Sequence, residues 1–284
     1  MQLKPVTLQF NFKLQKLTTS PFGRCFVLLN NIFMEINADL KLAVLIDADN
    51  VPYANVKSMM EEIAKYGTPT FKRIYGDWTK PQLSGWKKVL LENAITPVQQ
   101  YSYTTGKNST DSALIIEAMD ILYTGGVDGF CIVSSDSDFT RLAIRLREAG
   151  KKVFGIGEKK TPAPFIVSCN KFIYIEILEK EEKPEALHKK EDPKKNIKRT
   201  PVVSAISRDL INLISTSIND IAEDDGWVFL GTLGSLILKK QPDFDPRNYG
   251  FKKLVDIIKS IPSIQIDERH SGKNNISHFY VRTK

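Results

Sequence analysis

In Leu42-Ala43-Val44-Leu45-Ile46-Asp47-Ala48-Asp49-Asn50, five apolar residues run directly into two carboxylates and an amide. A short apolar run of this kind is typical of a strand that is buried on both faces of a parallel sheet. A second such run, Phe130-Cys131-Ile132-Val133, leads into Ser134-Ser135-Asp136-Ser137-Asp138. Ligands of open α/β sheets bind outside the carboxyl ends of the strands, so we expect both polar segments to meet in one crevice.

Strand and helix patterns alternate through residues 41–178. We expect strands at 42–47, 70–75, 96–101, 130–134, 152–156 and 172–175, and helices at 56–65, 81–92, 109–122 and 139–149. Alternation of this kind predicts an α/β domain in which helices cover both faces of a parallel sheet.

The remaining chain divides into three parts. Residues 203–284 show three helical patterns and then a two-stranded hairpin, which is the order of a small winged-helix (α+β) domain. Residues 179–202 are densely charged, so we expect a flexible linker. Residues 1–40 show no clear period and are expected to form a poorly ordered leader; an alternative is that translation starts at Met34.

Composition indicates a globular protein of the cytoplasm. The 284 residues are 42% hydrophobic and carry a net charge of +7, which is compatible with a polyanionic partner. No apolar stretch reaches the roughly 18 residues of a membrane span, and no signal peptide is apparent. The three cysteines lack the spacing of metal ligands, and only three histidines are present, so a zinc site or a Ser-His-Asp triad is poorly supported.

Three carboxylates are the strongest candidates for a metal site. Asp47 and Asp136 follow the two apolar runs, and Asp111 lies in the first turn of an expected helix. A first-turn Asp is common because it meets the positive end of the helix dipole, so Asp111 gains significance only beside the other two. Like charges in one crevice are unfavourable unless a cation lies between them, and oxygen ligands are what Mg²⁺ or Mn²⁺ prefers.

Several neighbouring polar residues are secondary candidates. Asp77 follows the second expected strand in Gly76-Asp77-Trp78, at the same sheet edge as Asp47, although an Asp in a turn is the simpler interpretation. The segments that contain Asp47 and Asp136 also supply side chains that would either support the site or cap the following helices: Asp49, Asn50, Ser134, Ser135 and Asp138.

Four lysines lie around the expected strand that ends near Gly157, namely Lys151, Lys152, Lys159 and Lys160. A solvated face is the default interpretation of such charges. The alternative is contact with the phosphates of an RNA, because loops at the carboxyl edge of the sheet would meet an anionic substrate.

Four motifs in order carry a resemblance to a known family: Leu-Ile-Asp-Ala-Asp-Asn (45–50), Tyr-Gly-Asp-Trp (75–78), Ser-Thr-Asp-Ser-Ala-Leu (109–114) and Ser-Ser-Asp-Ser-Asp-Phe (134–139). Over about residues 41–178 the chain resembles the NYN domain, a PIN-like, Rossmannoid ribonuclease fold of the LabA-type group. The resemblance implies that Asp47, Asp111 and Asp136 bind Mg²⁺ or Mn²⁺ and that Asp77 is a fourth acid. It also implies that Asn50 and Asp138 assist.

The C-terminal part resembles the OST-HTH, or LOTUS, domain. Two segments carry this resemblance: Gly226-Trp227-Val228-Phe229-Leu230-Gly231 and Asp243-Phe244-Asp245-Pro246-Arg247-Asn248-Tyr249-Gly250. The family is associated with RNA binding and, in some members, with protein partners. Four basic residues near the third helix and the hairpin are then candidates for RNA contact, although a plain solvent face would explain them too: Arg247, Lys252, Lys253 and Lys273.

These features together favour a metal-dependent ribonuclease with a C-terminal RNA-binding module, and a homodimer is compatible with them. One alternative is a catalytically weak platform that binds RNA or protein. A second is a haloacid-dehalogenase-type phosphatase, because Asp47-Ala48-Asp49-Asn50-Val51 fits an Asp-x-Asp-x-Val nucleophile pattern. In that mechanism Asp47 is a covalent nucleophile and Asp49 the acid/base, while Asp111 has no role.

Overall fold

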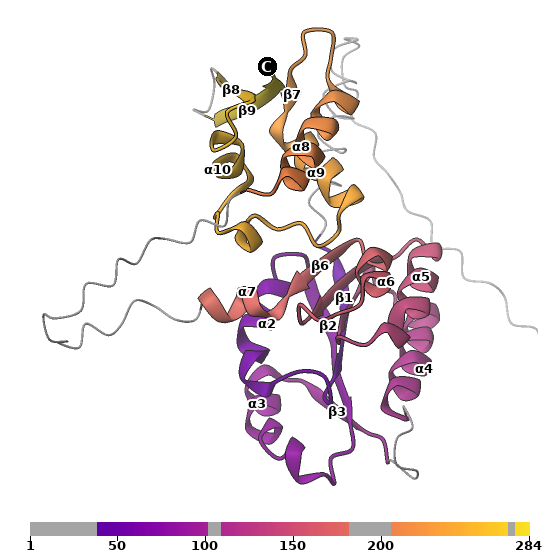
Figure 1. The fold of residues 1–284 in the computed structure, drawn as a ribbon. Helices are drawn as coiled ribbons and strands as arrows, with labels where there is room; N and C mark the ends of the chain where they lie inside the picture. Colours follow the sequence, from indigo (N-terminus) through magenta and orange to yellow (C-terminus); the bar gives the residue numbers. More distant parts are fainter. Residues whose placement is uncertain (1–38, 102–108, 182–205, 272–275) are drawn as a thin grey trace, which may run out of the picture. The chain divides into compact units, whose positions relative to one another are not determined.

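An all-parallel sheet of six strands is the centre of residues 41–174 (Figure 1). The computed structural model describes residues 39–101, 109–181, 206–271 and 276–284. The strands lie in the order β3-β2-β1-β4-β5-β6. Their bounds are Lys41–Asp47 (β1), Thr68–Gly76 (β2), Thr96–Gln99 (β3), Gly129–Val133 (β4), Lys152–Gly157 (β5) and Lys171–Tyr174 (β6). The predicted α/β class is confirmed.

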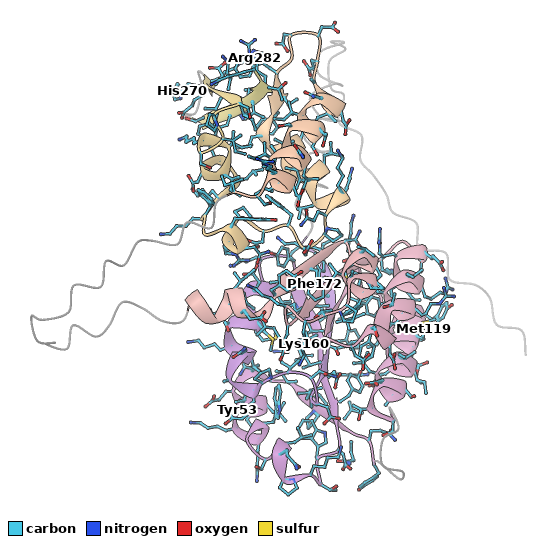
Figure 2. All side chains as sticks on the ribbon, in the orientation of Figure 1. Tyr53, Met119, Lys160, Phe172, His270 and Arg282 are labelled. Atoms are coloured by element: carbon cyan, nitrogen blue, oxygen red, sulfur yellow. The ribbon has the colours of Figure 1, made fainter. Side chains whose placement is uncertain are left out.

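Helices cover both faces of this sheet, and Figure 1 shows α2 and α3 on the opposite side from α4 and α5. One layer holds α2 (Val56–Ile63), α3 (Trp86–Asn93) and α7 (Ile175–Glu181), and the other holds α4 (Ser109–Thr124), α5 (Thr140–Glu148) and α6 (Ala163–Ser168). Short 3₁₀ helices occur at Tyr53–Asn55 (η1), Pro81–Leu83 (η2) and Ser137–Phe139 (η3). Figure 2 shows the side chains between the layers, with Phe172 among them.

Alternation along β1 explains why both faces are apolar. Leu42, Val44 and Ile46 pack into the core on the α2–α3 side, whereas Ala43 and Leu45 pack into the core on the α4–α5 side. Successive side chains of a strand point to opposite faces, so the next residue, Asp47, belongs to the α4 side. The direction of the Asp47 carboxylate therefore follows from the register of the apolar run.

The strand order reverses between β1 and β4. The chain builds β1, β2 and β3 outward in one direction and β4, β5 and β6 in the other, and Ile46 pairs with Val133 at the junction. Such a reversal opens a crevice at the carboxyl ends of the two central strands, where ligands of doubly wound folds bind. Asp47 and Ser134 are the first residues beyond this last pair.

Two helices were not expected from the sequence. In α6, Pro162 occupies the N-cap position and Pro164 lies in the first turn, where a missing N–H costs least. The other, α7, runs to Glu181 and so overlaps the start of the predicted linker. Its apolar residues Ile175 and Leu178 pack into the core on the α2–α3 side of the sheet, which overrides the charge of the segment.

The C-terminal residues form a small domain of helices and an antiparallel sheet, as predicted. It contains α8 (Arg208–Ile221), β7 (Val228–Phe229), α9 (Leu230–Lys240), η4 (Pro246–Tyr249), α10 (Leu254–Lys259), β8 (Ile264–Ser271) and β9 (Ile276–Thr283). The sheet order is β7-β9-β8. Ser207 caps α8 by accepting a hydrogen bond from the Leu210 N–H, and the core contains Ile214, Leu233 and Val281.

Some expectations fall outside the described residues, including those for 1–38, most of the 179–202 linker and Lys273.

Cys131 and Cys169 are buried and free, as expected of core cysteines. None of the helices in the described ranges has the length and hydropathy needed to cross a membrane.

Candidate functional site

Asp47 is buried at the end of β1 and is held by three donors. Its side chain is 0% exposed. Oδ1 accepts a hydrogen bond from the Asp49 N–H at 3.1 Å, and Oδ2 accepts from Asn50 Nδ2 at 2.5 Å and from Ser134 Oγ at 2.9 Å. Each carboxylate oxygen has two lone pairs, so Oδ1 retains one for a further ligand. Asn50 and Ser134, both predicted to support the site, therefore fix the Asp47 carboxylate.

Three other carboxylates come within reach of a single cation. Oxygens of Asp111, Asp136 and Asp138 all lie within 4.8 Å of one another. Asp111 belongs to the first turn of α4, and Asp136 is the N-cap of η3, where its side chain accepts from the Asp138 N–H at 2.9 Å. Asp138, predicted only to assist, is thus part of the group, whereas Asp47 lies beside it.

Ser134 connects Asp47, at the end of β1, to Asp136, at the start of η3. Its hydroxyl donates to Asp47 and accepts from the Asp136 N–H at 3.1 Å, so one buried side chain sets the position of residues from β1 and from η3. Ser135 has a different partner, because its hydroxyl accepts from the Glu158 N–H at 2.9 Å and holds the loop after β5. The two adjacent serines therefore have separable roles.

The electrostatics of the site are unfavourable without a cation. Burial, and after it the nearby charges of Asp47, Asp136, Asp138 and Asp49, together raise the pKa of Asp111 to about 6. Burial also raises the pKa of Asp47, although the hydrogen bonds from Asn50 and Ser134 oppose that effect. Across the described residues, Asp47, Asp111 and Asp136 form no salt bridge. The site therefore has excess negative charge.

Asp77 lies at the end of β2 but is not one of the three clustered carboxylates. It is 7% exposed, and its Oδ1 accepts hydrogen bonds from Thr79 Oγ1 at 2.6 Å and from Gln99 Nε2 at 3.0 Å. These contacts tie the ends of β2 and β3 together. A role for Asp77 as a fourth acid remains a prediction.

The four candidate lysines of the sheet domain divide between two edges. Lys151 and Lys152 lie at the amino end of β5, opposite the acidic edge, and Lys151 Nζ donates to the Val127 carbonyl at 2.8 Å. Lys159 and Lys160 follow the carboxyl end of β5, and Lys160 Nζ lies 2.6 Å from a Glu158 carboxylate oxygen. The placement favours only the second pair for contact with a substrate at the acidic edge.

Arg247, predicted to contact RNA, is already paired with carboxylates. Its guanidinium donates to both carboxylate oxygens of Glu62, at 3.0 and 2.8 Å, and to Asp245 at 2.8 Å. Burial alone would raise the pKa of Glu62, but hydrogen bonds led by that from Arg247 lower it to about 2. Contact between Arg247 and RNA would require these pairs to break, whereas Lys252 and Lys253 are exposed.

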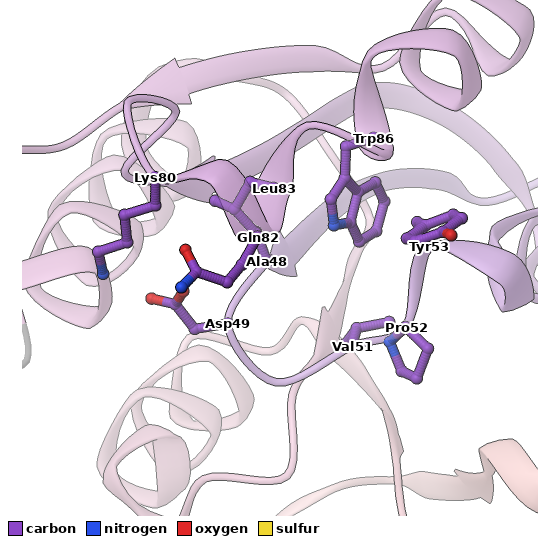
Figure 3. A pocket seen from close by; sticks show the side chains of 9 residues that line it. All are labelled: Ala48, Asp49, Val51, Pro52, Tyr53, Lys80, Gln82, Leu83 and Trp86. Carbon is purple, nitrogen blue, oxygen red and sulfur yellow. The ribbon is translucent and has the colours of Figure 1, made fainter.

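A pocket that the sequence did not predict opens beside Asp49 (Figure 3). It has a volume of about 570 Å³ and is formed by the segment after β1 and by the start of η2 and α3. Figure 3 shows Tyr53 and Trp86 at one end and the polar groups of Asp49, Lys80 and Gln82 at the other. The only sequence signal was an aromatic residue directly after Val51-Pro52, which is common in turns and carries little information.

Solved structures give partial similarities. A Vibrio parahaemolyticus protein of unknown function is 21% identical, with a TM-score of 0.41, and the match covers 49% of this chain and 94% of that one. An uncharacterized Nitrosomonas europaea protein is 27% identical (TM-score 0.27; 34% and 92% covered), and a Chromobacterium violaceum protein is 29% identical (TM-score 0.23; 28% and 84% covered). A search of curated proteins found no match.

Two family models match the chain in succession. The model of the NYN domain matches residues 41–176, which span the parallel sheet and include Asp47, Asp77, Asp111, Asp136 and Asp138. The model of the OST-HTH/LOTUS domain matches residues 201–276. The chain therefore carries an NYN domain, which is a PIN-like nuclease fold, followed by an OST-HTH/LOTUS domain, a type of domain that binds RNA.

Proposed function

We propose that this protein is a metal-dependent ribonuclease that hydrolyses RNA phosphodiester bonds at the carboxyl edge of its parallel sheet. The observation that carries the proposal is the gathering of the Asp111, Asp136 and Asp138 oxygens within 4.8 Å at the point where the strand order reverses. This supports a nuclease more than a neutral binding platform, because clustered carboxylates repel a phosphate backbone unless a cation lies between them.

The donor set fits Mg²⁺ or Mn²⁺. All the candidate ligands are carboxylate oxygens, which these hard cations prefer. Burial is the first cause of the raised pKa of Asp111, and the neighbouring aspartates that raise it as well are negative charge that a cation would compensate. Asp111, Asp136 and Asp138 would hold the ion, and Asp47 would contribute through Oδ1. When bound, such an ion activates water and neutralises charge on the scissile phosphate.

The residues of the chain then have distinct tasks. Asp47, buried and held by Asn50 and Ser134, keeps one edge of the site rigid, while Asp136 is aligned through its own N-cap contact. Lys159 and Lys160 follow β5 at the acidic edge of the sheet and are suited to contact the RNA backbone. In the C-terminal domain, Lys252 and Lys253 are exposed and are better candidates for RNA contact than Arg247, which is paired with carboxylates.

The phosphatase alternative is weakened by the surroundings of Asp47. A covalent nucleophile needs an oxygen that the substrate can reach, but the Asp47 side chain is 0% exposed and both of its oxygens accept hydrogen bonds. In this arrangement Asp47 is better suited to orient other groups than to attack a phosphate.

Cleavage of RNA is expected to require a divalent cation. Labelled single-stranded and structured RNAs should be cut by the wild-type protein in Mn²⁺ or Mg²⁺ but not in EDTA. The double variant Asp47→Asn/Asp136→Asn should leave them intact, because it removes one of the three clustered carboxylates and the buried carboxylate beside them. If the wild type binds RNA but leaves it uncut under every condition, the protein is a binding platform and the proposal is wrong.

Ser134→Ala is expected to weaken binding of Mn²⁺ roughly 10- to 100-fold, the usual cost of removing a group that positions metal ligands. Ser134 alone bridges Asp47 and the Asp136 backbone, so its loss frees both sides of the site. The measurement is the Mn²⁺ concentration that gives half of the maximal thermal stabilisation. Ser135→Ala is the matched control and should stay within twofold of wild type; equal shifts in both variants would argue against the bridging role.

A further inference from the structure

We infer that the pocket beside Asp49 binds one nucleobase of the RNA strand next to the scissile phosphate. The inference rests on the proposed function for its substrate class, but the pocket itself is separate from the clustered acids. Ala48 and Asp49 line it directly after Asp47. Asp47 belongs to the α4 side of the sheet, whereas Ala48 packs on the α3 side. An RNA strand that crosses the carboxyl end of β1 would therefore meet the acidic residues on one side and the pocket on the other.

The aromatic end of the pocket is suited to a flat, apolar ring. Val51, Leu83 and Trp86 are all less than 10% exposed and form its wall, whereas Tyr53 is 49% exposed. The ring of Tyr53 meets that of Trp86 edge-on, with centroids 6.5 Å apart at 66°. Trp86 thus fixes the Tyr53 ring while much of that ring remains open. Stacking on such a ring accepts any base, because every base has a π-face.

Two glycines allow this wall to form. A Cβ on Gly85 would lie 2.8 Å from Tyr53 Cε1, so only glycine lets Tyr53 approach the start of α3 so closely. A Cβ on Gly76 would lie 2.8 Å from Leu83 Cδ1 and 3.0 Å from Ala48 Cβ. The pocket therefore depends on close approach of backbone to side chain at both positions, which gives a way to disturb it without removing a lining group.

The polar end offers donors without partners. Among the described residues, Lys80 Nζ and the Gln82 amide form no hydrogen bond or ion pair. These donors are available to a ligand that carries acceptor oxygens. Figure 3 shows Lys80 and Gln82 extending to the same side as Asp49, so sugar and phosphate oxygens would lie there and the base near Tyr53.

The volume of the pocket is that of a site for a small ligand such as a nucleotide. About 570 Å³ lies within the roughly 300–1,000 Å³ of small-ligand sites. A free mononucleotide has the same chemistry as one unit of an RNA strand. The position beside the acidic site favours the strand, because a strand would engage the pocket and the acids together.

The test is binding of a short fluorescein-labelled single-stranded RNA to the full chain in EDTA, followed by anisotropy. Tyr53→Ala should weaken binding roughly tenfold, as the loss of one stacked base does, and Gly85→Ala should act in the same direction by displacing the ring. Tyr53→Phe keeps the ring and should stay within twofold. Tyr123→Ala removes an aromatic residue that is 69% exposed on α4 and should have no effect.

Two comparisons separate this inference from the proposed function. AMP should bind far more weakly than the oligonucleotide, and equal affinity would overturn the assignment to an RNA strand. Unchanged RNA affinity in Tyr53→Ala, with melting temperature preserved, would overturn the base site even if Mn²⁺-dependent cleavage is seen. Conversely, RNA that binds through Tyr53 but is never cut would support the base site while removing the nuclease proposal.

Discussion

Asp136→Asn is expected to lower the rate of metal-dependent RNA cleavage roughly a thousandfold. The several kcal/mol that a bound cation contributes to such a reaction convert to about that factor, at 1.36 kcal/mol per tenfold. Asp136 is one of the three residues whose oxygens lie within 4.8 Å of one another, and asparagine keeps the shape while removing the charge. Single-turnover rates in saturating Mn²⁺ are the measurement, and Asp111→Asn should behave alike.

Three further variants serve as comparisons. Asp120→Asn changes an exposed carboxylate on the same helix as Asp111 and should leave the rate unchanged. Asp77→Asn should cost less than tenfold, since Asp77 is tied to Thr79 and Gln99 and is not among the clustered three. Asp49→Asn tests the phosphatase alternative: a loss far greater than that of Asp111→Asn would restore the mechanism in which Asp49 is the acid/base.

Much of the acidic site could be predicted from the sequence because strand ends are local features. The apolar run before Asp47 predicts a buried strand, and a parallel sheet brings all carboxyl ends to one edge. The same rule explains why one prediction, that all four lysines around β5 contact RNA, is not supported for two of them. Lys151 and Lys152 are close to Lys159 and Lys160 in sequence, but they lie at the amino end of β5 rather than after its carboxyl end, and the full length of the strand separates the two pairs.

Other features depend on contacts that no local pattern carries. The pocket joins Tyr53 to Trp86 across more than thirty residues of sequence, and its shape depends on the missing Cβ atoms of Gly76 and Gly85. Arg247 pairs with Glu62, which is 2% exposed and lies 185 residues away in the sequence. Asp138 and Asp47 are both near the site, but only side-chain geometry shows that Asp138 joins the group of three.

Asp111→Asn is also expected to stabilise the metal-free protein at neutral pH. The native-state pKa of Asp111, about 6, exceeds its ordinary value of 3.8, so the folded protein holds this proton more tightly than the unfolded chain does. Stability therefore falls as pH rises from about 4 to 6, and above that range the ionised Asp111 costs roughly 1–2 kcal/mol after allowance for partial exposure. Asparagine removes this cost, so the melting temperature in EDTA near pH 7.5 should rise by about 2–8 °C.

The same substitution should have opposite effects with and without metal, which distinguishes a cation site from a helix cap. With Mn²⁺ present, wild type should gain stability from binding and Asp111→Asn should gain much less, so the order of melting temperatures reverses. The gain of wild type should shrink as pH falls through 6, because protons compete for Asp111. If Asp111 only met the dipole of α4, Asp111→Asn would lower the melting temperature in EDTA by the equivalent of about 0.3–1 kcal/mol. A lower melting temperature in EDTA, unaltered by Mn²⁺, would therefore assign Asp111 to helix capping.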